Sequence, residues 1–332
     1  MIEILTTGHG NSVQDRGRYG YLDAGVGRSG AMDRLALDIA NLMAGNGADA
    51  AGIEISVFPF RLRFHADCQV AFAGADSPVT LAGRALPSLW SAPARARDEL
   101  RIEPPTAGAR VYLAFEGGLD VPLVLGSRST DLKSGWGGHE GRGLHRGDRL
   151  NLLPVANRPD RNHLPAGFGL DVTALRGSMD HPGHLRVLPG AEWAAFGEAG
   201  QRLLCETPWQ VGKKANRQGY RLLGPELQPE SKRELFSHGI MPGTVQVPPN
   251  GQPIIQLAEA NTCGGYAKIA HVVEADLWRL GQLKPGDPIR FRPISREEAI
   301  EALREESRAF SALRRAVRMI TRNYAAFEGA GA

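Results

Sequence analysis

Short runs of β-forming residues, separated by glycine and proline turns, dominate the sequence between residues 52 and 154. The candidate strands are Ile53–Val57, Arg61–Phe64, Gln69–Ala73, Val79–Leu81, Glu99–Ile102, Arg110–Phe115 and Arg149–Leu153. Many short strands with turns between them are typical of a barrel or a sandwich and not of a fold that alternates strands and helices. The pieces Leu144–Pro154 and Leu283–Pro293 share leucine, Gly-Asp and proline at equal offsets. We therefore predict a mainly β (α+β) fold with two β units in tandem.

Two helices are expected beside these strands. An apolar face at three- and four-residue steps predicts a helix over residues 32–44, which Ser29 or Asp33 could cap. A capping box at 295–298 predicts a helix from Ser295 onward, with an apolar stripe that includes Ile300 and Leu303. The expected boundaries are a first subdomain over 1–154, a connection over 155–184, a second subdomain over 185–294 and a helical tail over 295–332.

Composition narrows the class of protein. A chain of 332 residues is long enough for two cores, and its net charge of +3 gives no electrostatic case for nucleic acid. The three cysteines are far apart and lack CxxC spacing, which argues for a reducing compartment and against a structural zinc site. The first residues do not resemble a signal peptide, and no apolar run is long enough to span a bilayer. We expect a cytoplasmic protein that binds neither membrane nor metal.

Familiar catalytic motifs are missing from the sequence. It contains no P-loop, no G-x-S-x-G elbow, no H-E-x-x-H and no HxE…CxxC. The G-x-G-x-x-G match at residues 25–30 lacks the buried strand that a dinucleotide site requires just before its first glycine. Any reaction must therefore use polar loops on a β scaffold.

The stretch 243–271 is the first candidate for such a site. Two β-type runs, Thr244–Val247 and Ile254–Leu257, flank Pro-Pro-Asn-Gly-Gln-Pro, which predicts a hairpin. Gly264 and Gly265 would let backbone N–H groups approach a ligand, and Lys268 would add a positive charge. The alternative is an ordinary hairpin with a solvated lysine.

Two other segments carry polar residues near glycines. The loop 126–141 holds Arg128, Ser129 and Asp131 and is costly to order unless it has a role; otherwise it is a flexible surface excursion. Arg28 and Ser29 lie just before the predicted helix 32–44, where free N–H groups could bind an anion. The alternative there is a capping serine and a solvated arginine.

Several motifs in one order resemble a known family. They are residues 13–17 with 20–21 (VQDRG, GY), 29–33 (SGAMD), 117–122 (GGLDVP), 125–131 (LGSRSTD), 216–222 (NRQGYRL), 243–248 (GTVQVP), 251–253 (GQP) and 264–270 (GGYAKIA). Together they resemble the family of 5-oxoprolinase C subunits, also called the biotin-dependent carboxyltransferase or allophanate-hydrolase-subunit-2-like family. The resemblance covers roughly residues 10 to 298.

The resemblance implies a fold and partners. The fold would be two tandem cyclophilin-like β-barrel subdomains, and the partners would be a related B-like chain and an A-type chain of the LamB/YcsF kind in a heteromeric complex. The reaction would be the ATP-dependent opening of 5-oxo-L-proline to L-glutamate, with ATP used by the complex and not necessarily bound here. In related urea carboxylases the region resembles a carboxyltransferase that moves CO2 from carboxybiotin to urea. Any biotin would sit on a partner chain, since the Met-Lys-Met of an attachment site is absent here.

Both chemistries act on a poorly reactive amide and need donors for an anionic oxygen. We therefore assign Lys268 as the oxyanion or carboxylate donor, with Arg128 and Arg217 as clamps. The expected substrate-binding residues are Arg28, Ser29, Ser129, Asp131, Asn216, Tyr220, Gln246, Gly264, Gly265 and Tyr266. Asn216 and Gln246 would orient the amide, and the two tyrosines would shape the pocket. The resemblance also implies a third hypothesis, a non-catalytic chain that binds a kinase inhibitor, with the terminal helix as the interaction element.

Overall fold

The chain folds into two compact units. The computed structural model describes residues 1–155, 167–176, 183–231 and 234–329, with the side chains of the last helix described up to residue 321. The first unit comprises Met1–Gly17, Arg34–Gly177 and Ser307–Ala332, and the second comprises Arg18–Asp33 and Ser178–Glu306. Most of the expected connection, 155–184, lies outside the described residues.

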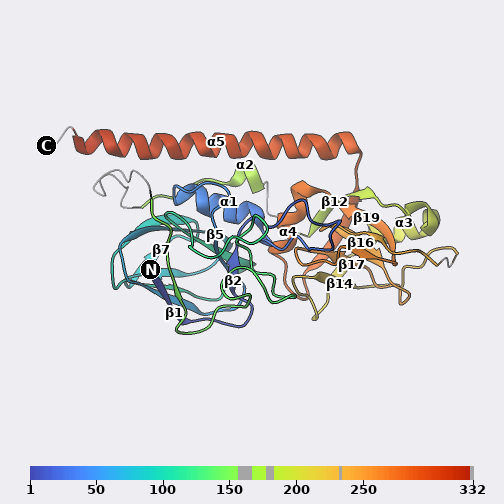
Figure 1. Cartoon of the computed structure of the whole chain (residues 1–332). Coiled ribbons are helices and arrows are strands. Elements are labelled where there is room, and N and C mark those ends of the chain that lie inside the picture. Colours follow the sequence, from blue (N-terminus) through green and yellow to red (C-terminus); the bar gives the residue numbers. More distant parts are fainter. Residues whose placement is uncertain (156–166, 177–182, 232–233, 330–332) are drawn as a thin grey trace. The chain divides into compact units, whose positions relative to one another are not determined.

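Two antiparallel sheets form the first unit (Figure 1). The six-stranded sheet runs β11 (Arg149–Leu150), β1 (Ile2–Thr6), β4 (Phe60–Phe64), β9 (Glu99–Ile102), β6 (Val79–Leu81) and β7 (Arg84–Leu86). The five-stranded sheet runs β2 (Ser12–Gln14), β3 (Gly52–Ile55), β10 (Ala107–Phe115), β5 (Cys68–Asp76) and β8 (Trp90–Ala94). Every strand predicted between residues 52 and 154 is present, with ends shifted by a few residues.

Strand β4 shows why these runs become strands. Phe60, Leu62 and Phe64 alternate into the core and are fully buried, as period-2 patterning requires. Arg61 and Arg63 point to the other face, where each pairs with Glu99 of β9 at 2.6 Å. One strand therefore contributes to the core on one face and to a solvated ion-pair cluster on the other.

Helix α1 (Arg34–Met43) packs against β5 and β10 and confirms the helix predicted over 32–44. Its buried face includes Leu35, Ile39 and Met43, as the spacing predicted. Gly45, at φ +78°, follows the last turn in the left-handed conformation that commonly ends helices.

The second unit is a closed seven-stranded barrel. Its strands follow the order β12 (His184–Pro189), β19 (Ala267–Val272), β16 (Thr244–Val247), β17 (Ile254–Gln256), β14 (Gly219–Leu223), β13 (Trp209–Val211) and β20 (Pro288–Pro293). The barrel closes where β20 pairs with β12 in parallel, whereas the other neighbours are antiparallel. The mainly β fold class is thus confirmed.

Short elements decorate the barrel. They are η2 (Trp193–Phe196), α3 (Gly197–Glu206), η3 (Glu274–Asp276), α4 (Leu277–Gly281) and a two-stranded ladder of β15 (His238–Gly239) with β18 (Cys263–Gly264). Strands β16 and β17 pair antiparallel, with Gln246 opposite Ile254, which confirms the predicted hairpin. The ladder of β15 and β18 is a separate two-stranded sheet that is not part of the barrel.

Residues 18–33 pack with the second unit, although the expected boundaries put them in the first subdomain. Arg217 Nη2 donates to the Gly30 carbonyl at 2.6 Å, and Gln282 Nε2 donates to Asp33 Oδ2 at 2.7 Å. Met32 is 6% exposed and belongs to the barrel's core cluster. An early excursion of the chain thus completes a core whose strands come more than 150 residues later.

Helix α5 (Arg296–Gly329) begins at the predicted capping box. The Ser295 N–H donates to Glu298 Oε2 at 2.7 Å, and the Glu298 N–H donates to Ser295 Oγ at 3.1 Å. Ala299 and Ala302 are buried, whereas the predicted stripe members Ile300 and Leu303 are 40% and 39% exposed. In the first turns the buried face is therefore set one residue away from the expected one, where alanines allow close packing. Further along the helix it follows the predicted stripe, since Val317 is 6% exposed.

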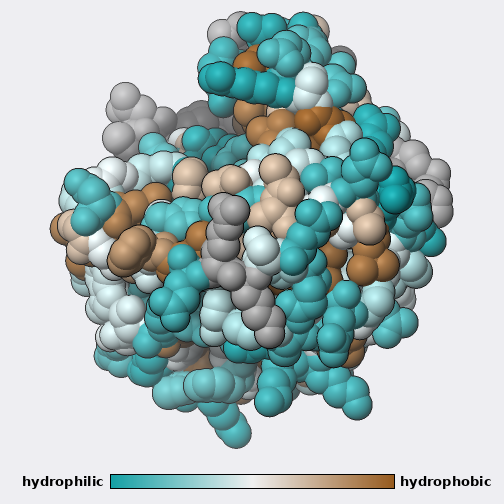
Figure 2. Space-filling model, turned by 90° about the vertical axis from the view of Figure 1, so that its right-hand side faces the viewer, coloured by the Kyte–Doolittle hydropathy of each residue, from teal (hydrophilic) through white to brown (hydrophobic). Residues whose placement is uncertain are grey.

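One face of the molecule is mixed in polarity. Figure 2 shows one face on which hydrophobic side chains gather in small groups between hydrophilic ones. No helix within the described residues is long and apolar enough to cross a membrane.

Candidate functional site

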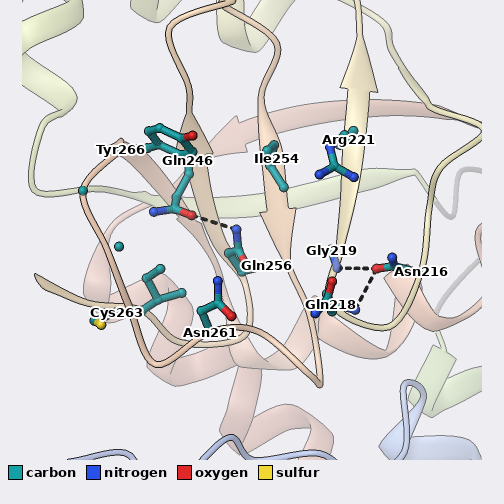
Figure 3. A pocket seen from close by; sticks show the side chains of 13 residues that line it. Asn216, Gln218, Gly219, Arg221, Gln246, Ile254, Gln256, Asn261, Cys263 and Tyr266 are labelled. Carbon is teal, nitrogen blue, oxygen red and sulfur yellow. Dashed lines mark hydrogen bonds between the residues drawn. The ribbon is translucent and has the colours of Figure 1, made fainter. Parts of the chain in front are cut away.

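A pocket of about 340 Å³ opens on the second unit, at the hairpin predicted as the first candidate site (Figure 3). That volume is in the range of small-molecule sites. Its lining comprises Asn216, Gln218, Gly219, Arg221, Ile240, Gln246, Ile254, Gln256, Asn261, Cys263, Gly264, Gly265 and Tyr266. Five of the predicted site residues are among them: Asn216, Gln246, Gly264, Gly265 and Tyr266.

Carboxamides dominate the polar part of the lining. Gln246 of β16 and Gln256 of β17 face each other, and Gln256 Nε2 donates to Gln246 Oε1 at 2.7 Å (Figure 3). Asn216 Oδ1 accepts from the N–H groups of Gln218 and Gly219 at 2.9 and 3.2 Å, which shapes the turn into β14. Arg221 is the one ionised side chain in the lining that the structure describes, and it is exposed. Such a lining suits a small ligand that carries an amide group, because a carboxamide both donates and accepts.

Lys268 lies outside the pocket lining and hydrogen-bonds to the backbone of residues that line it. It is 5% exposed, and its Nζ donates to the Gly264 carbonyl at 2.9 Å, to the Tyr266 carbonyl at 3.4 Å and to His238 Nε2 at 2.8 Å. Burial lowers the pKa of Lys268, and the nearby Glu192 and Cys263 partly oppose this effect. In this structure the ammonium therefore holds the glycine segment and does not line the pocket, so the predicted role as oxyanion donor stays a prediction.

Arg217 and Tyr220 are not among the residues that line the pocket. Arg217 is 8% exposed, and its Nε donates to Glu259 Oε1 at 2.6 Å. Tyr220 is 1% exposed in the barrel core, where its hydroxyl donates to the Leu283 carbonyl at 3.3 Å. The structure therefore gives Arg217 a place in a buried ion pair and Tyr220 a place in the core.

Arg28 and Ser29 lie in the excursion 18–33 of the second unit. The Arg28 guanidinium stacks over the Tyr19 ring at 4.1 Å and is 3.9 Å from Glu274 Oε2. Ser29 is 4% exposed and has a φ of +51°, which is uncommon for a residue with a Cβ. Neither residue lines the pocket.

Arg128, Ser129 and Asp131 belong to the first unit. Asp15 accepts hydrogen bonds from the Arg128 N–H, the Ser129 hydroxyl and the Ser127 hydroxyl. Asp131 Oδ1 accepts from the Ser134 N–H at 2.9 Å, and both Ser129 and Asp131 are buried. Hydrogen bonds to a buried carboxylate thus order the loop 126–141, which is not a flexible excursion.

Sequence reasoning missed several lining residues: Gln218, Gly219, Arg221, Ile240, Ile254, Gln256, Asn261 and Cys263. It also missed His238, which contacts the Lys268 ammonium. Gln256 carried a usable signal, because it is a polar residue inside a predicted strand that pairs with the strand of Gln246.

The described residues contain no group of three His, Cys, Asp or Glu side chains that could hold a metal ion.

Comparison with known proteins identifies the family. A family described as "Carboxyltransferase domain, subdomain A and B" matches residues 24–293. The chain belongs to this carboxyltransferase-domain family. The region matched includes the whole pocket and the barrel that carries it.

Relatives in this family include both bacterial and fungal proteins. The chain is 41% identical over 321 residues to the C subunit of 5-oxoprolinase from Escherichia coli, covering 94% of this chain and 97% of that protein. It is 30% identical over 313 residues to urea amidolyase of Saccharomyces cerevisiae, covering 90% of this chain but only 17% of that protein. The solved urea carboxylase of Kluyveromyces lactis superposes with a TM-score of 0.82 at 29% identity, covering 93% of this chain and 28% of that one.

Proposed function

We propose that this chain is the C-type component of an ATP-dependent 5-oxoprolinase complex, which opens 5-oxo-L-proline to L-glutamate together with partners of the A and B types. The observation that carries the proposal is the 41% identity to the C subunit of a 5-oxoprolinase over nearly the full length of both chains. The carboxamide-lined pocket supports it, because 5-oxo-L-proline is a small lactam with both an N–H donor and a carbonyl acceptor.

Each part of the pocket has a role in this proposal. The carboxamides of Asn216 and Gln246 orient the lactam, as expected from the sequence, and Arg221 at the exposed side meets the substrate carboxylate. Lys268 holds the carbonyls of Gly264 and Tyr266, so that the glycine wall keeps its shape when the ligand binds. Hydrogen bonds from preorganised donors stabilise charge that develops on the carbonyl oxygen when the ring opens.

The pocket does not fit ATP. A triphosphate needs several cations, a metal ion or a run of backbone N–H groups, whereas the lining that the structure describes holds one arginine. We therefore propose that the complex binds ATP outside this pocket.

A second candidate is a carboxyltransferase that acts with carboxybiotin on urea or another amide. The family description and the similarity to urea carboxylase favour it. The ureido ring of biotin is a neutral carbonyl between two N–H groups, which the carboxamides of Gln246 and Asn261 could hold in the same pocket. When bound, carboxybiotin would supply the CO2 that is transferred.

Reconstitution tests the proposal. The full chain is purified with its A- and B-type partners, and glutamate release is measured with 5-oxo-L-proline and ATP, omitting each component in turn. We expect turnover that requires this chain, all partners and ATP. Turnover that persists without this chain would contradict the proposal.

A parallel assay distinguishes the candidates. The same preparation is probed with streptavidin for a biotinylated chain and assayed for ATP- and bicarbonate-dependent carboxylation of urea. Carboxylation without glutamate release would favour the carboxyltransferase. A stable complex without either activity would favour the non-catalytic hypothesis.

A further inference from the structure

The carboxamide of Gln246 offers an unsatisfied hydrogen-bond donor to the pocket. Gln246 lines the pocket and is 3% exposed, yet its Nε2 has no hydrogen-bond partner among the described residues. A buried N–H group that has lost its water without gaining an acceptor is costly, and such groups are few in folded proteins. A ligand acceptor that reaches this nitrogen would remove that cost.

Gln256 determines which end of this carboxamide faces the pocket. A carboxamide accepts at its oxygen and donates at its nitrogen, and Gln256 Nε2 donates to Gln246 Oε1 at 2.7 Å. Anchoring the oxygen leaves the nitrogen of Gln246 on the other side, as Figure 3 shows. The two side chains are held at this spacing because β16 and β17 are paired strands.

Gly264 leaves space beside the donor. A Cβ atom at this position would lie 3.2 Å from Gln246 Nε2 and 2.8 Å from Ile240 Cδ1. Gly264 is not among the residues with positive φ, so its backbone conformation does not require glycine. The requirement comes from space: a side chain at residue 264 would collide with Ile240 and crowd the nitrogen of Gln246.

We propose that Gln246 and Gln256 form a recognition pair for the carbonyl oxygen of a small lactam or carboxamide. Gln246 Nε2 donates to that oxygen, and Gln256 is a positioning residue that acts through Gln246. The surrounding lining suits an uncharged amide group, because Asn216, Gln218 and Asn261 are neutral carboxamides. The identity of 5-oxo-L-proline as the natural ligand rests on the proposed function; the recognition of a carbonyl oxygen does not.

Isosteric variants test the orientation of the pair. In Gln256→Glu the new carboxylate can only accept, so it attracts Gln246 Nε2 and turns Gln246 Oε1 toward the pocket. In Gln246→Leu the donor is removed. Gln210→Glu makes the same chemical change at an exposed position of β13 outside the lining and is the matched control.

Binding to the full-length chain is measured by ligand-observed NMR titration with 2-pyrrolidinone and with 5-oxo-L-proline. We expect each of the Gln246→Leu and Gln256→Glu substitutions to weaken binding of both probes about tenfold to a hundredfold, because one buried hydrogen bond is lost. Gln210→Glu binds as the wild type does. Because Gln256 acts through Gln246, the double variant Gln246→Leu/Gln256→Glu binds the neutral probe 2-pyrrolidinone no more weakly than Gln246→Leu alone.

Several results would overturn the inference. They are wild-type affinity in either folded single variant, additive losses in the double variant, or no saturable binding of either probe to the wild-type chain. If Gln246→Leu unfolds, Gln246→Glu replaces it, since this isostere still accepts from Gln256 but presents no donor.

The two proposals fail separately. If the complex shows no 5-oxoproline turnover but 2-pyrrolidinone binding still depends on Gln246, the proposed function fails and the recognition pair stands. If turnover is present and its KM is unchanged in both single variants, the function stands and the recognition pair fails.

Discussion

At the scale of single residues, Arg217 has observed contacts that differ from its predicted role, and that role stays a prediction. Its motif predicted a substrate clamp, but the side chain forms a buried ion pair with Glu259 and donates to the Gly30 carbonyl. Sequence cannot distinguish these two uses of an arginine, because both need a planar donor beside an acceptor. The acceptors come from positions 42 and 187 residues away along the chain.

Replacing Arg217 by methionine should destabilise the second unit. Glu259 is 4% exposed, so replacing Arg217 removes the guanidinium that donates to this buried carboxylate at 2.6 Å. The expected loss in the free energy of unfolding is about 3–5 kcal/mol, measured by urea denaturation followed through tryptophan fluorescence. Arg202→Met, at an exposed position of α3, is the control and should change the stability little.

The outcome separates a structural arginine from a substrate clamp. If Arg217 were a substrate clamp, replacing it would abolish turnover by the complex but leave the free energy of unfolding of this chain unchanged. The double variant Arg217→Met/Glu259→Gln should be more stable than Arg217→Met alone, because the buried negative charge of Glu259 is then gone as well.

Lys268 should make the free energy of unfolding depend on pH above neutrality. Burial lowers its pKa in the folded chain below the ordinary value. Between the lowered pKa and the unfolded one, the unfolded chain binds more protons, so stability should rise with pH in this window. The difference in thermal midpoint between wild type and Lys268→Met should therefore shift in favour of the wild type as pH increases from 7 to 10.

A matched substitution completes that test. Lys284→Met removes an exposed lysine that pairs with Asp287 across the surface. Its midpoint should keep a nearly constant offset from the wild type over the same pH range. An offset for Lys268→Met that is equally flat would contradict the effect of burial.

At the scale of elements, the strands could be predicted from the sequence, whereas the pairing that closes the barrel could not. Alternation of apolar and polar residues fixes strands such as β4 locally, and Pro-Pro-Asn-Gly fixes the β16–β17 hairpin. The pairing of β12 with β20 joins residues about 100 positions apart, and no local pattern encodes it. The same holds for the loop 126–141, whose order depends on Asp15.

Two glycines of that loop share the left-handed backbone conformation but differ in the space available for a side chain. Gly135 and Gly141 both have positive φ, but a Cβ at Gly135 meets open space, whereas one at Gly141 would lie 2.2 Å from the Gly135 carbonyl oxygen. Gly135→Ala should cost about 1–2 kcal/mol from the left-handed conformation alone. Gly141→Ala should cost about 1–3 kcal/mol more, because backbone must move. Chemical denaturation of the two variants measures the difference, and equal losses would show that the loop yields easily.

At the scale of the whole molecule, the excursion 18–33 explains why linear boundaries differ from the compact units. The segment is rich in glycine and reads as a loop of the first subdomain, yet its Met32 enters the core of the barrel. Family motifs at 29–33 and 216–222 are distant in sequence and meet at the bond from Arg217 to Gly30. The resemblance identified both motifs, but only the fold shows that one supports the other.

At Gly281, the last residue of α4, helix propensity and the packing of residues 32–33 predict opposite effects of an alanine substitution. Alanine is favoured over glycine in helices by about 1 kcal/mol, and Gly281 lacks a positive φ, so helix propensity predicts that Gly281→Ala stabilises the chain. The structure predicts the opposite, because a Cβ there would lie 2.7 Å from both the Met32 carbonyl oxygen and the Asp33 nitrogen. We expect a lower thermal midpoint for Gly281→Ala and little change for Gly239→Ala, whose Cβ meets open space. A raised midpoint for Gly281→Ala would mean that residues 32–33 do not pack on α4, and hydrogen exchange at Met32 and Asp33 would then show the same weak protection in both variants and in the wild type.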